Sequence, residues 1–66
     1  EHINPESAAH NIATIFSDIF VKSLNNNRIL DINGSEISTA AKKAAQVYAI
    51  VYDSVHEEII KENSSE

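Results

Sequence analysis

Apolar residues recur every three or four positions along two stretches of this chain, with a short polar break between them. This spacing places side chains on one face of an α-helix, which has about 3.6 residues per turn. The first stretch predicts a helix from 5 to about 25, and the second predicts a helix from about 34 to 61. The chain is therefore predicted to be all-α, a single domain (1–66) folded as an antiparallel two-helix hairpin.

Capping residues mark the start of both predicted helices. Asn4 and Asn33 are N-cap candidates, because their side-chain oxygens can accept hydrogen bonds from the backbone N–H groups of the first turn. Pro5 suits the first helical position, where its missing N–H group is not needed. Glu36 lies three residues after Asn33 and can close a capping box with it.

The connector, 26–33, alternates apolar and polar residues. It either extends like a strand or lies across the open end of the hairpin, and we favour the second arrangement because a lone strand has no partner. The tail, 62–66, is polar and is predicted to fray.

The second predicted helix is about 10 Å longer than the first, so its last turns should extend past the hairpin. These turns carry three apolar residues, Val55, Ile59 and Ile60. Either the N-terminal arm around Ile3 or a second chain is expected to cover them.

Both apolar stripes span about half of the helix circumference, wider than the roughly 100° that one neighbouring helix covers. A chain of 66 residues without cysteine has few other ways to gain stability than association. We therefore predict that two hairpins pair into a dimeric four-helix bundle, the alternative being a monomer with a loose core. The predicted self-association interface comprises Ile12, Phe16, Ile19, Phe20, Ala44, Val47, Tyr48, Val51, Val55 and Ile59.

Charge is unevenly distributed along the second helix. Lys42 and Lys43 lie in its first half, whereas four acidic residues lie in its second half, where carboxylates oppose the helix dipole. Antiparallel pairing of this helix with its own copy, centred near Ile50, would bring the lysines near the acidic residues of the other chain. The alternative is an ordinary solvated charged face.

A second surface is a candidate for binding another protein. Tyr48 and Tyr52 lie one turn apart, either as packing at the rim of the hairpin or as a hot spot of an interface. The candidate partner surface combines one of these tyrosines with an apolar residue and three carboxylates: Ile50, Tyr52, Asp53, Glu57 and Glu58.

Two carboxylate–histidine pairs resemble the spacing of metal ligands in helical bundles. Glu6 and His10 are four residues apart, and Asp53 and His56 are three apart. Both pairs fall on polar flanks of the helices, whereas a bundle metal site needs inward ligands with supporting hydrogen bonds. With a single glycine, the chain also lacks phosphate-binding loops. No metal site, cofactor or catalytic residue is predicted.

The formal net charge of −5 disfavours nucleic acid as a partner, because that binding depends on many lysine and arginine contacts to phosphate. No membrane span or signal peptide is apparent, which favours a cytoplasmic location, although the chain does not begin with Met and is expected to be a processed product or a fragment. The predicted function is a non-catalytic protein–protein interaction and assembly module that pairs with itself. The alternative is a small acidic regulator that occupies a basic site on a partner protein.

Overall fold

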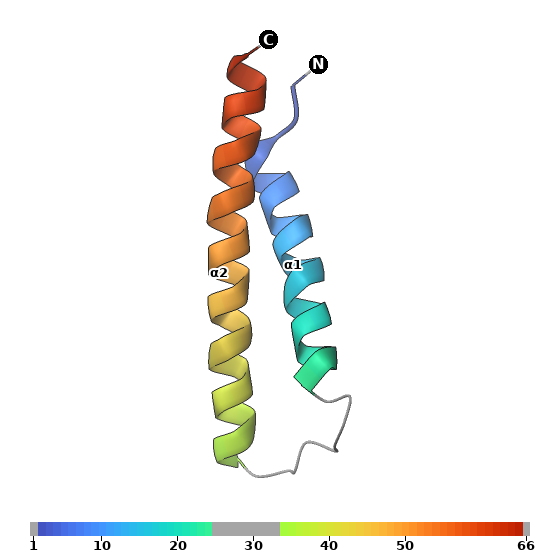
Figure 1. Ribbon diagram of the computed structural model, residues 1–66, viewed down its shortest axis with the longest axis vertical. Coiled ribbons are helices and arrows are strands. Elements are labelled where there is room, and N and C mark those ends of the chain that lie inside the picture. Colours follow the sequence, from blue (N-terminus) through green and yellow to red (C-terminus); the bar gives the residue numbers. More distant parts are fainter. Residues whose placement is uncertain (1, 25–33, 66) are drawn as a thin grey trace.

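The computed structural model describes residues 2–24 and 34–65. Helix α1 spans Pro5–Leu24 and helix α2 spans Gly34–Ser64. The two helices lie side by side in opposite directions, with the start of α1 and the end of α2 at the same end of the hairpin (Figure 1). No strand occurs among the described residues, and the predicted all-α hairpin is confirmed. The predicted connector, 26–33, and its Asn33 cap lie outside the described residues.

The start of α1 is held by Asn4. Its side-chain Oδ1 accepts a hydrogen bond from the backbone N–H of Ser7 (2.9 Å), and its backbone carbonyl accepts one from Ala8 (3.1 Å). The first bond satisfies a donor that the first turn would otherwise leave unpaired, and the second is the first regular bond of the helix. The N-cap predicted at Asn4 is therefore confirmed.

Alanines form the centre of the helix pair. Ala9 and Ala13, one turn apart on α1, are fully buried, and no large side chain among the described residues is fully buried. Ser17 Oγ donates a hydrogen bond to the backbone carbonyl of Ala44 on α2 (3.3 Å), which requires the two backbones to approach closely. Small side chains at the contact permit this approach. Half-buried apolar residues surround them: Ala8, Ile12, Phe20, Leu24, Ala40, Val47, Val51, Val55 and Ile59.

The N-terminal arm packs beside the last turns of α2, which extend past the start of α1 (Figure 1). The Asn63 side chain forms two hydrogen bonds with the backbone of Ile3: its Oδ1 accepts from the N–H (3.3 Å) and its Nδ2 donates to the carbonyl (2.8 Å). The arm is therefore attached at this end, although Ile3 and Ile60 are still 53% and 46% exposed. These bonds also explain why α2 continues to Ser64, past the predicted end at Lys61 and into the predicted tail.

The hairpin is elongated. Its radius of gyration is 15.0 Å, whereas a compact chain of this length has about 11 Å. The Cα extents are 49 × 18 × 13 Å. Two helices side by side enclose little volume, so each helix keeps much of its surface in contact with solvent.

Candidate interaction surfaces

Three large apolar side chains of α1 are more than half exposed. Ile15, Phe16 and Ile19 are 58%, 52% and 57% exposed. Their spacing of one and three residues places them on one continuous sector of the helix. We call Ile15, Phe16 and Ile19 the α1 apolar patch.

The structure divides the predicted self-association interface into two groups. Phe16 and Ile19 are exposed and belong to the α1 apolar patch. The other eight predicted residues are half-buried within the single hairpin: Ile12, Phe20, Ala44, Val47, Tyr48, Val51, Val55 and Ile59. Ile15, which is not among the predicted interface residues, is more exposed than either Phe16 or Ile19.

Four rings form a continuous row that crosses from α1 to α2. His10 Nδ1 and Tyr48 Oη are joined by a hydrogen bond of 2.9 Å, and the two rings meet edge to face with centroids 5.9 Å apart. Tyr48 stacks on Tyr52 and Tyr52 stacks on His56, each pair with centroids 5.8 Å apart. We call these four residues the ring ladder. Tyr48 therefore contributes to the contact between the helices, as the rim-packing interpretation requires.

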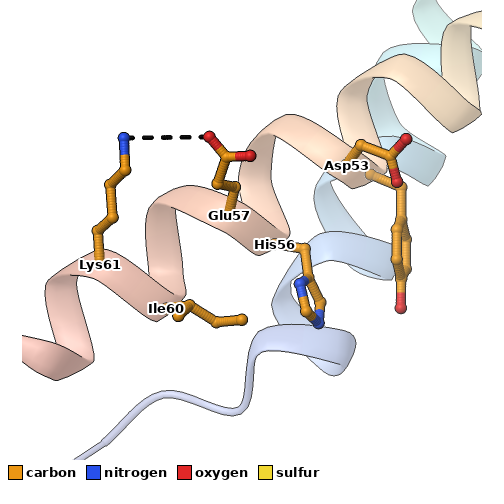
Figure 2. Close-up of a pocket in the computed structure, with 6 residues that line it drawn as sticks. Asp53, His56, Glu57, Ile60 and Lys61 are labelled. Atoms are coloured by element: carbon orange, nitrogen blue, oxygen red, sulfur yellow. Dashed lines mark ion pairs between the residues drawn. The ribbon is translucent and has the colours of Figure 1, made fainter.

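A shallow groove of about 620 Å³ runs along the C-terminal half of α2 where the ring ladder ends. Figure 2 shows Asp53, Glu57 and Lys61 along one side of this part of the helix, with His56 and Ile60 along the neighbouring side. The Lys61 Nζ and a Glu57 carboxylate oxygen are 4.0 Å apart, and both side chains are exposed. We call this surface the acidic groove; its lining residues are Tyr52, Asp53, His56, Glu57, Ile60 and Lys61.

The acidic groove includes part of the predicted partner surface. Tyr52, Asp53 and Glu57 line it, whereas Ile50 and Glu58 are exposed but lie outside it. His56, Ile60 and Lys61 were not predicted as members of this surface. Each of them lies four residues after another residue of the groove, at 52, 56 and 57, and this spacing was the available signal because positions four apart lie on the same face of a helix.

The α1 apolar patch and the ring ladder lie on opposite sides of the hairpin. Nine residues separate His10 from Ile19 on α1, which at 100° per residue is a rotation of about 180° around the helix axis. Because His10 contacts Tyr48, the ladder side of α1 is fixed, and Ile19 points away from it. The two surfaces can therefore be occupied at the same time.

Within 2–24 and 34–65, no group of three or more His, Asp or Glu side chains is arranged to hold a metal ion. Of the two carboxylate–histidine pairs considered from the sequence, His10 bonds to Tyr48 and His56 stacks on Tyr52. In the same residues, neither helix has a segment long and apolar enough to cross a membrane.

No family model, curated protein or solved structure matches this chain.

Proposed function

We propose that this protein is a non-catalytic assembly module whose hairpins pair with each other. The observation that carries this proposal is the distribution of apolar burial. Among the described residues, the fully buried apolar ones are the small Ala9 and Ala13, whereas Ile15, Phe16 and Ile19 each expose more than half of their surface. A hairpin with this distribution keeps in water the side chains whose burial would contribute most to stability.

The exposed area of the hairpin supports pairing quantitatively. Its accessible surface is 5068 Å² for 7.3 kDa, about 900 Å² more than the scaling for compact monomers gives. A standard protein–protein interface buries about 800 Å² on each partner. Pairing of two hairpins would thus bring the exposed area per chain close to that of an ordinary small domain.

Sedimentation equilibrium of the full chain over about 1–300 µM, with helicity followed by circular dichroism, tests this proposal. We expect a dimer whose dissociation at low concentration is accompanied by loss of helicity, since the core of the single hairpin consists of alanines and half-buried side chains. A helical monomer at the highest concentration would refute the proposal.

A second candidate function, a small acidic regulator that binds a basic partner, is supported by the acidic groove. Asp53 and Glu57 are exposed carboxylates one turn apart, where their mutual repulsion opposes helix formation, and Lys61 approaches Glu57 no closer than 4.0 Å. Beside them, Tyr52, His56 and Ile60 offer a surface for an aliphatic stem. A long basic side chain fits this pattern, with its stem against the rings and its charge between the carboxylates.

Chemical shift changes of the ¹⁵N-labelled chain, titrated with a short arginine peptide at low salt, test this second function. The same peptide with citrulline, which is neutral and nearly isosteric with arginine, serves as the ligand control. We expect chemical shift changes at 52–61 with the arginine peptide and none with the citrulline peptide. The arginine peptide should bind more weakly to Asp53→Asn than to Glu58→Gln, a control that removes the same charge outside the groove. Equal losses in the two variants would show attraction by net charge only and would exclude the groove as a site.

A further inference from the structure

Two residues of the α1 apolar patch, Ile15 and Ile19, belong to a longer seam on α1. Ala8, Ile12, Ile15, Ile19 and Lys22 follow each other at alternating intervals of four and three residues. This spacing is that of the positions that meet a partner helix in a coiled coil. Ile15 is midway between the two ends of the seam, Ala8 and Lys22.

From this seam we infer where and how two copies meet: α1 packs against α1 of a second copy in antiparallel orientation, with the two-fold axis close to Ile15. The inference rests on the proposed self-association and specifies its surface and orientation. In a two-fold dimer the same surface is used by both copies, so a seam that is symmetric about its own centre suits this arrangement.

The residues at the ends of the seam favour antiparallel over parallel packing. In a parallel pair, Lys22 of each copy would face the other Lys22 across the seam, and like charges would repel each other. In an antiparallel pair, Lys22 faces the small Ala8 of the second copy, which leaves room for its long side chain. Opposed helix dipoles also favour the antiparallel orientation.

Charge favours α1 over α2 as the inner helix of the dimer. The α1 helix has only three charged residues, Glu6, Asp18 and Lys22. Two of these form an ion pair within the helix, with 3.1 Å between Lys22 Nζ and Asp18 Oδ2. On the far side of α2, by contrast, Ile50 is 66% exposed but is separated along its helix face from other exposed large apolar residues by Lys43 and Glu57. A single exposed isoleucine is ordinary on a protein surface, whereas three adjacent large apolar residues are not.

Disulfide crosslinking of single-cysteine variants tests this inference, because the chain has no cysteine of its own. In the antiparallel arrangement, Ile15→Cys lies next to its own copy and should crosslink on mild oxidation. Two copies of Ile19→Cys are displaced by about 12 Å along the axis, beyond the reach of a disulfide. Ile19→Cys should therefore crosslink only when mixed with Ile12→Cys. Ile50→Cys, of similar exposure, is the matched control and should stay monomeric on a non-reducing gel.

Any other pattern of crosslinking overturns the inference. Crosslinking of both Ile15→Cys and Ile19→Cys with themselves would show parallel packing. Crosslinking of Ile50→Cys, or of no variant although sedimentation shows a dimer, would place the interface elsewhere and leave the proposed self-association intact. A chain that sediments as a monomer would refute both.

A glutamine pair provides a second measurement that does not depend on oxidation. Ile19→Gln should raise the dissociation constant of the dimer by about a hundredfold, because both copies carry the change and the interface loses two isoleucines, each contributing about a factor of ten. Ile50→Gln makes the same chemical change on α2 and should alter the dissociation constant of the dimer by less than about twofold. Equal effects of the two variants would contradict packing through α1.

Discussion

At the scale of single residues, two asparagines hold the N-terminal region of the hairpin. Asn4 caps α1 with its side-chain oxygen, and Asn63 uses both ends of its amide to hold the backbone of Ile3. The second contact spans 60 positions of the sequence. It makes the last turn of α2 and the N-terminal arm depend on each other.

Replacing Asn63 with alanine should release the arm. The two exposed hydrogen bonds are together expected to contribute about 0.5–1.5 kcal/mol to the free energy of unfolding. Urea unfolding at fixed protein concentration and the exchange rate of the Ile3 amide proton measure the two effects. Asn11→Ala, at an exposed position of α1, is the control. An Ile3 amide that exchanges equally fast in both variants would show that the Asn63 contact is not formed in solution.

Sequence reasoning succeeded for local signals and failed for this contact. The Asn4 cap follows from one residue and its neighbours, so it could be predicted and is confirmed. Asn63 looked like part of a polar tail, because nothing near it in the sequence indicates a partner at Ile3. A side-chain amide is suited equally to a frayed end and to a backbone contact, and only the fold distinguishes the two.

At the scale of the elements, the contact between α1 and α2 depends on small residues. Ala9 and Ala13 are fully buried where the helices approach. Larger side chains at these positions would push the helices apart and disturb the ring ladder, which requires His10 and Tyr48 within hydrogen-bond distance.

Ala13→Leu should therefore lower the free energy of unfolding by about 1–3 kcal/mol through overpacking. Leucine and alanine have similar helix propensities, so the helix itself is little affected. Ala49→Leu makes the same change at an exposed position of α2 and should stay within about 0.5 kcal/mol of the parent chain. Urea unfolding of both variants at one protein concentration provides the comparison, and equal stabilities would contradict the close approach at Ala13.

The helices and their apolar stripes could be predicted from periodicity, but the sector of each stripe that faces the other helix could not. Each stripe spans about half of its helix, so several rotations bury similar numbers of apolar residues. Ile12 and Phe16 were therefore equivalent in the sequence, although the structure half-buries Ile12 and exposes Phe16. The ring ladder was missed for the same reason, because its His10–Tyr48 contact depends on the register between the helices.

At the scale of the whole molecule, a dimer that pairs through α1 and one that pairs through α2 should respond differently to changes of charge at Lys42 and Lys43. Pairing through α2 about Ile50 would place Lys42 and Lys43 near acidic residues of the second copy, whereas pairing through α1 leaves both lysines outside the interface. Reversing both charges (Lys42→Glu with Lys43→Glu) should therefore change the dissociation constant by less than about threefold at low salt, where charge effects are strongest. Sedimentation equilibrium measures this constant, with Ile19→Gln as the positive control. A large loss of association that disappears in high salt would favour α2.

Association should also appear in the thermal stability. If folding and pairing are one event, dilution shifts the equilibrium toward unfolded single chains, and the midpoint of thermal unfolding depends on concentration. For a dimer of two 66-residue chains, a tenfold increase in concentration should raise the midpoint by about 5 °C. Circular dichroism melts over a hundredfold range of concentration measure this slope. Ile50→Gln should keep the slope, and Ile19→Gln should show a lower midpoint at every concentration. A midpoint that does not move with concentration would mean that the alanine-centred hairpin is stable alone, and the exposed Ile15, Phe16 and Ile19 would then need a different explanation.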